Sequence, residues 1–241
     1  MKISIIIPAY NEAKLLGGTL RAVRQACTAL ERRGWAIETI VCDNNSADET
    51  AQVAAAAGAR VVFEPVNQIG RARNSGARVA TGDWLWFVDA DSWPDETLFD
   101  AVASCIVFGR VLAGGCRLRM DRPTGPGRVA LAIWNLASCL GRWPAGAFLF
   151  VEAWAFREIG GFDERLYVGE EIDLVRRLRA QARARGQRIV VLWHPYLLTS
   201  ARKLYLYTFS EYLRFGLRML CHARKTVRNR ETCHVWYDGR R

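Results

Sequence analysis

The sequence predicts an α/β fold with a mostly parallel sheet flanked by helices. Short apolar runs alternate with longer segments in which apolar residues recur every three or four positions, the order expected of strand–helix–strand units. The run Trp84–Val88 is apolar throughout, which is typical of a strand covered on both faces. Polar side chains follow several of these runs, at the edge where open α/β sheets bind ligands.

The first four strands are predicted at residues 3–7, 37–42, 60–63 and 84–88, with helices at 12–33, 46–57 and 70–80 between them. In the first helix, Leu16, Leu20 and Val23 follow helical spacing. Pro8 ends the first strand and Asn11 is expected to cap this helix. Residues 46–49 have the form of a capping box, which is expected to open the second helix.

The second half is less regular. It predicts a helix start at residues 92–95, a strand at 114–120, a Pro/Gly-rich loop at 121–128, an aromatic strand-like segment at 148–156, a helix at 170–185 and a strand at 189–193. Residues 129–140, with the neighbouring Trp143, are either a membrane-interfacial patch or core. Two units are expected, a domain over 1–198 and a C-terminal amphipathic helical tail over 199–241.

Composition limits the class of protein. With 241 residues, 51% hydrophobic and 24% charged, the chain can build one large core and is not a disordered protein. The formal net charge of +10 predicts an acidic partner, which is nucleic acid, an anionic membrane surface or a phosphate-bearing substrate. Seven scattered cysteines without a CxxC pair favour a reducing cytosol over disulfides or a zinc site. No signal peptide and no run of 18 apolar residues is recognised.

The tail is basic and aromatic. From residue 199 onward it carries ten Lys or Arg against three Asp or Glu. This composition fits an interfacial helix that approaches anionic lipid, and it fits equally a helix packed on the domain with a solvated basic side.

Asp89 and Asp91 directly follow the apolar strand at 84–88. Neighbouring carboxylates repel each other unless a cation lies between them. Hard oxygen ligands suit Mg²⁺ or Mn²⁺, ions that also bridge phosphate oxygens. These residues therefore predict a divalent metal that holds a diphosphate, and the alternative is an ordinary acidic turn.

Other strand ends supply further candidates. Tyr10 and Asp43 are placed to contact a nucleobase. Arg71 and Arg73, at the opening of the third helix, form either a site for anionic oxygens or a solvated basic face.

Together these segments resemble the ordered motifs of family 2 glycosyltransferases of the GT-A fold, in a bacterial-type single-domain member, over roughly residues 2–195. The matching segments are IIIPAYNE at 5–12, CDNNSAD at 42–48, ARNSG at 72–76, FVDAD at 87–91, GAFLF at 146–150, IGGFDE at 159–164 and GEEIDL at 169–174. The chain departs from the family's usual Asp-Asp-Gly-Ser at residues 43–46, where Asn44 lacks the second charge. That departure leaves base recognition to Asp43.

The resemblance implies roles for individual residues. The nucleotide-sugar donor would contact Pro8, Tyr10, Glu12, Asp43, Arg73, Asp89 and Arg202. Asp91 and Asp89 would hold Mn²⁺ or Mg²⁺, which neutralises the departing nucleoside diphosphate. His194 is either a third metal ligand or a partly buried polar residue.

The acidic cluster Glu170, Glu171 and Asp173 matches the family's catalytic acids. Glu171 stands at the position of the general base in inverting members, and it must reach hydrogen-bond distance of the acceptor hydroxyl. The alternative is that these acids complement the helix dipole and pair with Arg176 or Arg177.

The expected function is transfer of a single sugar with inversion, from a nucleotide-diphosphate sugar to a hydroxyl of a glycolipid, glycan or protein. UDP is preferred over GDP, and the absence of a Gln-x-x-Arg-Trp segment favours single-sugar transfer over processive synthesis. The expected location is cytoplasmic, with peripheral contact at the inner face of a membrane. Two alternatives stay open, a catalytically inactive GT-A-like protein and a basic nucleic-acid- or membrane-binding protein. No nucleic-acid-binding motif supports a nucleic-acid partner, and none is expected.

Overall fold

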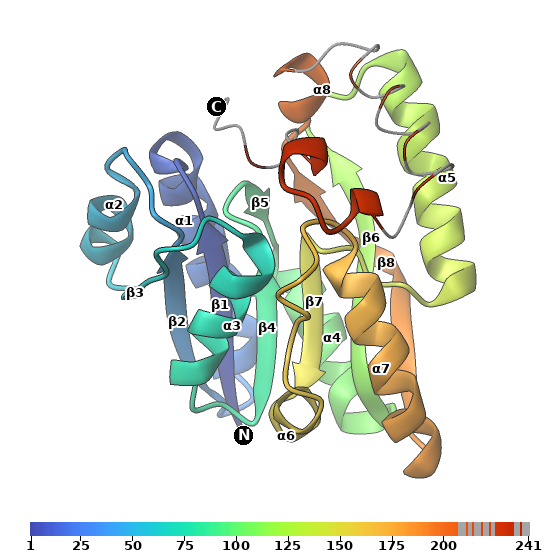
Figure 1. Cartoon of the computed structure of the whole chain (residues 1–241). Helices are drawn as coiled ribbons and strands as arrows, with labels where there is room; N and C mark the ends of the chain where they lie inside the picture. The colour runs from blue at the N-terminus through green and yellow to red at the C-terminus, as the bar shows by residue number, and fades with distance from the viewer. Residues whose placement is uncertain are drawn as a thin grey trace.

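One eight-stranded sheet carries the structure, in the order β3-β2-β1-β4-β7-β6-β8-β5 (Figure 1). The computed structural model describes residues 1–206, 211, 214, 218, 222, 225–233 and 237. The strands are β1 Lys2–Ala9, β2 Ala36–Asp43, β3 Arg60–Phe63, β4 Trp84–Val88, β5 Ser92–Trp93, β6 Val111–Met120, β7 Phe148–Glu152 and β8 Arg188–Thr199. The helices are α1 Ala13–Glu31, α2 Thr50–Ala56, α3 Ile69–Val79, α4 Glu96–Phe108, α5 Gly125–Gly141, α6 Ala153–Glu158, α7 Glu170–Ala184, α8 Lys203–Leu206 and a 3₁₀ turn, η1, at Glu231–Cys233.

The sheet is mostly parallel, as predicted. β3, β2, β1 and β4 run parallel, β7 is antiparallel to its neighbours β4 and β6, and β8 is parallel to β6. β5 follows β4 closely in the chain but pairs with β8 at the far end of the strand order. The backbone N–H of Ser200 therefore donates to the carbonyl of Asp91 at 3.0 Å. The end of β4 and the end of β8 meet at the same edge of the sheet.

The central strands are buried on both faces. Ile5, Ile7 and Trp86 pack with α1 and α4 on one face, and Trp86 meets Phe99 edge-on at 4.9 Å between ring centroids. Ile6 and Phe87 point to the other face, against α3, α6 and α7. Figure 1 shows this second group of helices in front of the sheet. The two-sided burial explains why these strands read as continuous apolar runs.

The two predicted capping residues have other roles. Asn11 has a left-handed φ of 52°, and its Oδ1 accepts a hydrogen bond from Ala47 N at 2.8 Å. Ser46 Oγ accepts from Asn11 N at 2.9 Å, and α2 begins only at Thr50. The predicted caps are therefore wrong, because these side chains tie the loops after β1 and β2 to each other instead of capping their own helices.

The second half departs further from the prediction. α5 begins inside the predicted loop 121–128, where Thr124 Oγ1 accepts from Gly127 N at 3.1 Å and Pro126 lies in the first turn. The predicted strand 148–156 ends at Glu152, and α6 follows. β8 continues through a cis His194–Pro195 bond to Thr199. The predicted domain boundary between residues 198 and 199 therefore falls before the last residue of β8, which pairs with Ser92 of β5.

About half of the residues of the predicted tail, 199–241, are described. Most of residues 204–220, its aromatic and apolar part, lie outside the described residues, but the carbonyl of Val227 accepts from Tyr167 N at 2.7 Å. The helices of the described part of the chain include none with the length and apolar character needed to cross a bilayer.

Candidate active site

A pocket at the carboxyl edge of the sheet brings together four of the predicted donor residues and the predicted metal ligand Asp91. It is lined by Pro8, Ala9, Tyr10, Glu12, Asn44, Asn67, Ile69, Asp89, Ala90, Asp91 and Tyr237. Pro8 lies near the end of β1, so the predicted end of the strand at this proline is wrong. The loop after β1 supplies Tyr10 and Glu12, and the loop after β4 supplies Asp89 and Asp91. These loops are neighbours because β1 pairs with β4. Three acidic residues and Tyr10 therefore line the same pocket.

Arg73, from α3, links this pocket to α7. Its side chain is 3% exposed. Nη2 donates to Asp89 Oδ1 at 3.0 Å and to the carbonyl of Gly146 at 2.9 Å, while Nη1 donates to Glu170 Oε1 at 2.7 Å. The alternative that Arg73 belongs to a solvated basic face is therefore wrong. A buried guanidinium with bound carboxylates on two sides holds those groups in fixed positions.

The two glutamates at the start of α7 have unusual acidity. Burial raises the pKa of Glu170, although Arg73 opposes the shift. Burial and the neighbouring Glu170 raise the pKa of Glu171 to about 8. A Cβ at Gly146 would lie 3.1 Å from Arg73 Nη2 and 3.7 Å from Glu171 Cδ, so Gly146 leaves room for both side chains. The arrangement supplies a carboxyl group whose affinity for a proton is suited to base catalysis near neutral pH.

Asp173 lies apart from this pair. Its carboxylate accepts from Arg176 Nη2 at 3.0 Å and from Arg177 Nε at 2.7 Å, and Arg177 also bonds the carbonyls of Ile159 and Gly161. In this structure Asp173 takes part in the ion pairs given above as the alternative to a catalytic role.

Arg202 approaches the pocket from the segment after β8. Its Nη2 lies 3.2 Å from Asp91 Oδ2 and also contacts Glu12 Oε1. Arg202 reaches Glu12, in the loop after β1, because the pairing of β5 with β8 brings the end of β8 next to the loop after β4. The cluster therefore joins residues that are almost 200 positions apart in the chain.

The loop after β2 explains the departure at Asn44. Asn44 Nδ2 donates to the carbonyls of Glu64 and Val66, at 3.2 and 2.7 Å, and its Oδ1 accepts from Gln68 N at 2.8 Å. A carboxylate could not donate the first two bonds. Asp43 is buried, and its Oδ1 accepts from Ser46 N at 3.1 Å. Asn44 thus fixes the loop that leads into α3.

Tyr237 is a pocket residue that sequence reasoning missed, since a lone aromatic in a basic tail carries no signal of its position. Its hydroxyl donates to the carbonyl of Tyr167 at 2.8 Å and accepts from Ile69 N at 3.4 Å. It therefore occupies an N–H at the start of α3, where the sequence suggested an anion site. Arg71, from the same turn, pairs with Glu164 at 3.0 Å.

His194 is not brought to this pocket. It is exposed in the middle of β8 and lines a separate groove with Arg117 and Arg119. Five residues of extended chain separate it from Thr199, a path of about 16 Å. The structure does not place His194 with Asp89 and Asp91, so it lacks the position of a third metal ligand.

The pocket chemistry fits a hard divalent cation. Asp89, Asp91 and Glu12 all line the pocket, and Mg²⁺ and Mn²⁺ favour carboxylate ligands. Within the described ranges there is no cluster of three or more His, Cys, Asp or Glu side chains arranged to hold a metal ion. A cation here would use the two aspartates and need further oxygens from its ligand.

Comparison with known proteins decides the family. Residues 4–144 match the family model described as Glycosyl transferase family 2. The chain belongs to this family. A curated relative, an uncharacterised glycosyltransferase of Mycobacterium bovis, is 37% identical to this family 2 chain over 93 residues, 39% of the chain and 38% of the relative. Validoxylamine A glucosyltransferase of Streptomyces hygroscopicus is also 37% identical over 93 residues, 36% of the chain and 21% of that protein. The matches thus span well under half the length of these relatives.

Solved structures confirm the GT-A fold of the family 2 chain. TarS of Staphylococcus aureus in complex with UDP-GlcNAc has a TM-score of 0.65 at 18% identity, with 98% of this chain and 69% of that chain covered. A mannosyltransferase of Pyrobaculum calidifontis in complex with GDP-Man and Mn²⁺ has a TM-score of 0.65 at 19% identity, with 94% of this chain and 64% of that chain covered. Glucosyl-3-phosphoglycerate synthase of Mycobacterium tuberculosis in complex with Mn²⁺ and UDP has a TM-score of 0.64 at 18% identity, with 98% of this chain and 80% of that chain covered.

Proposed function

We propose that this protein is a metal-dependent, inverting glycosyltransferase that moves one sugar from a nucleotide-diphosphate sugar, with UDP preferred over GDP, to a hydroxyl acceptor. The observation that carries the proposal is the pocket in which Tyr10 and the carboxylates of Glu12, Asp89 and Asp91 lie together, with Glu171 held close to the bound Arg73. The similar folds include proteins in complex with UDP-GlcNAc and with GDP-Man and Mn²⁺, which supports a nucleotide-sugar donor.

In this mechanism the base of the donor binds against Tyr10 and Asp43, and Asp89 and Asp91 hold Mn²⁺ or Mg²⁺. The cation supplies Lewis-acid stabilisation of the diphosphate charge. Arg202 lies beside Asp91 and adds a positive charge next to the diphosphate. Arg73 binds no phosphate in this scheme; it holds Asp89 and Glu170 in place.

Glu171 is the general base. Its carboxylate takes the proton of the acceptor hydroxyl while the acceptor oxygen forms a bond to the anomeric carbon, and the bond from that carbon to the diphosphate oxygen breaks. Attack from the face opposite the leaving group inverts the configuration. A pKa raised to about 8 makes Glu171 a stronger base than an ordinary glutamate once it is ionised.

The acceptor is a hydroxyl of a glycolipid, a glycan or a protein, and the reaction takes place on the cytoplasmic side. The excess of ten Lys or Arg over three acids from residue 199 onward supports peripheral contact of this tail with the inner face of a membrane.

Calorimetric titration of UDP and GDP, each with and without Mn²⁺, tests the donor site. We expect Mn²⁺-dependent binding of UDP that weakens at least about tenfold in Asp91→Ala. Asp100→Ala is the matched control, because Asp100 is a half-exposed aspartate on α4 that pairs with Arg33 outside the pocket. A folded wild type that binds neither nucleotide with Mn²⁺ would overturn the proposal.

A further inference from the structure

Helix α5 has its polar and apolar sides reversed. Only Gly127, Asn135 and Ser138 are buried among its 17 residues. Asn135 faces β6, where its Nδ2 donates to the carbonyl of Leu118 at 2.9 Å and its Oδ1 accepts from Leu118 N at 3.0 Å. Ser138 Oγ donates to the carbonyl of Trp143 at 2.7 Å. The buried residues of α5 are therefore small or polar, and the side chains of Asn135 and Ser138 are hydrogen-bonded.

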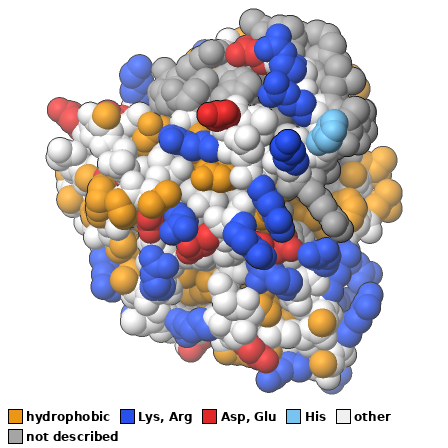
Figure 2. All heavy atoms as spheres, in the orientation of Figure 1, with side chains coloured by type: hydrophobic (Ala, Val, Ile, Leu, Met, Phe, Trp, Pro, Cys, Tyr) orange, Lys and Arg blue, Asp and Glu red, His pale blue; other side chains and the backbone are white. Residues whose placement is uncertain are grey.

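The outward side of α5 is apolar. Val129, Ile133, Leu136 and Leu140 are exposed by 60%, 64%, 52% and 78%, and their spacing of four, three and four places them on one face. Hydrophobic side chains gather at the right-hand edge of Figure 2, where α5 stands in Figure 1. Contiguous exposed apolar surface of this kind marks an interaction site. The alternative that residues 129–140 form core is therefore wrong.

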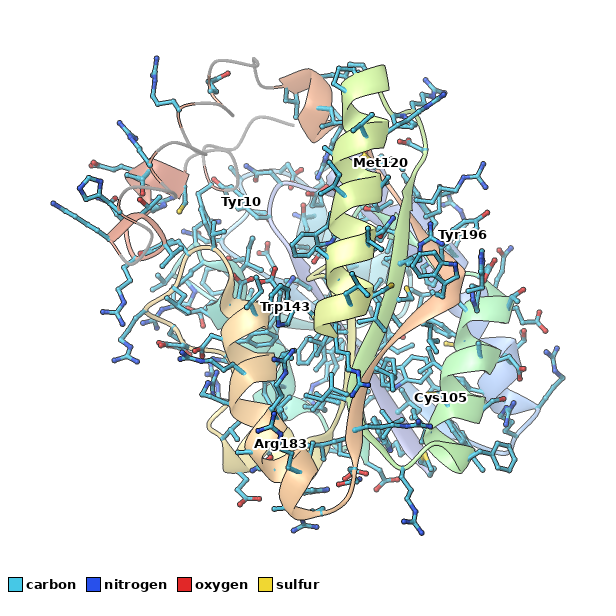
Figure 3. All side chains as sticks on the ribbon, turned by 90° about the vertical axis from the view of Figure 1, so that its right-hand side faces the viewer. Tyr10, Cys105, Met120, Trp143, Arg183 and Tyr196 are labelled. Carbon is cyan, nitrogen blue, oxygen red and sulfur yellow. The ribbon has the colours of Figure 1, made fainter. Side chains whose placement is uncertain are left out.

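Positive charge and aromatic side chains flank this apolar face. Residues 111–151 hold five arginines and one acid, Asp121, whose carboxylate accepts from the backbone N–H groups of Arg122 and Ala201. A groove beside α5 is lined by Arg117, Arg119, Arg128, His194 and Tyr196, among others. The guanidinium of Arg117 stacks on exposed Trp193 at 4.0 Å. Figure 3 views α5 from outside, with Tyr196 beside it and Trp143 near its C-terminal end.

We propose that α5 docks this protein on an anionic lipid surface. The helix lies in the plane of the interface, with Val129, Ile133, Leu136 and Leu140 in the acyl boundary and the flanking arginines on lipid phosphates. The charge pattern favours lipid over a second copy of the chain, because a self-complementary contact through this face would bring two arginine-rich surfaces together. The proposal concerns a surface other than the tail, and it does not depend on the identity of the donor.

The position of α5 connects this surface with the site. Gly127 packs against Leu204, two residues after Arg202. Beyond the other end of α5, Gly146 contacts Arg73 and lies next to Glu171. Docking through α5 would therefore hold the carboxyl edge of the sheet close to the lipid, where a membrane-borne hydroxyl is within reach of the base.

Co-sedimentation of the full chain with vesicles of phosphatidylglycerol and phosphatidylcholine, and with vesicles of phosphatidylcholine alone, tests the proposal. We expect the wild type to bind the anionic vesicles preferentially, and binding to weaken about tenfold or more in Ile133→Asp/Leu136→Asp. The matched control is Val107→Asp/Phe108→Asp, which changes two exposed apolar residues of α4 and should bind as the wild type does.

Arg119→Gln/Arg128→Gln should reduce the preference for anionic vesicles while the thermal unfolding of all variants stays that of the wild type. UDP titration of the α5 variant separates this surface from the donor site, since nucleotide binding should be unchanged. Absence of wild-type binding, or an equal loss in the α4 pair, would overturn the proposal. So would light scattering that reveals a dimer which the α5 substitutions dissociate.

Discussion

At the scale of single residues, the acidity of Glu171 gives a test that needs no substrate. In the folded protein its pKa is raised from 4.5 to about 8, mainly by burial. As pH rises above 4.5 the unfolded chain releases this proton first, so the stabilisation present at low pH is lost progressively up to pH 8. Glu171→Gln stays neutral and avoids that loss.

We therefore expect Glu171→Gln to gain about 3 to 4 kcal/mol in free energy of unfolding, relative to wild type, between pH 5 and pH 8. Urea unfolding at the two pH values measures the difference. Glu158→Gln, on α6 outside this cluster, serves as the control and should show no such trend. A constant difference between Glu171→Gln and wild type would mean that Glu171 titrates normally.

At the scale of elements, the pairing of β5 with β8 places Arg202 at the pocket. Removing its guanidinium takes away a positive charge beside the proposed diphosphate position, but it leaves Asp89 bound to Arg73. We expect Arg202→Gln to weaken UDP binding in the presence of Mn²⁺ by about tenfold, as measured by calorimetry. Arg119→Gln, on β6 in the groove beside α5, is the control. Equal affinities of Arg202→Gln and wild type would remove Arg202 from the donor site.

The elements also separate what the sequence could predict from what it could not. The apolar run at residues 84–88 predicts β4, because a strand that is buried on both faces requires an apolar side chain at every position. Asn11 and Ser46 are residue types that favour helix caps. In the structure they instead hydrogen-bond to each other's loop, 35 positions away in the chain. Residues 125–128 read as loop, since Gly and Pro suggest a turn, yet Pro is also favoured at the start of a helix.

The candidate site shows the same division. Asp89 and Asp91 could be predicted because a strand places them at the ligand-binding edge. Arg73 could be assigned to the site, but its contacts with Glu170 and Gly146 depend on segments more than 70 residues away. Nothing near Tyr237 in the sequence indicates that it reaches the pocket.

At the scale of the whole molecule, the end of the chain helps to build the site at its beginning. Tyr237 bridges Ile69 and Tyr167, its ring meets that of Tyr167 edge-on at 5.4 Å, and Arg230 Nη2 donates to Asn67 Oδ1 at 3.2 Å. Ile69, Asn67 and Tyr237 all line the pocket. These contacts tie the last described residues to α3 and to the loop before α7.

If this segment is part of the folded domain, removing the buried ring must cost stability and disturb the pocket together. We expect Tyr237→Ala to lower the free energy of unfolding by about 3 kcal/mol, from the lost apolar contacts and the unpaired Ile69 N–H, and to weaken UDP binding. Tyr205→Ala, at an exposed tyrosine of α8, should change neither. Urea unfolding and calorimetry on the same samples make the comparison. Because an independent tail would lose neither stability nor nucleotide affinity on this change, a silent Tyr237→Ala would support the predicted division of the chain into a domain over 1–198 and a tail over 199–241.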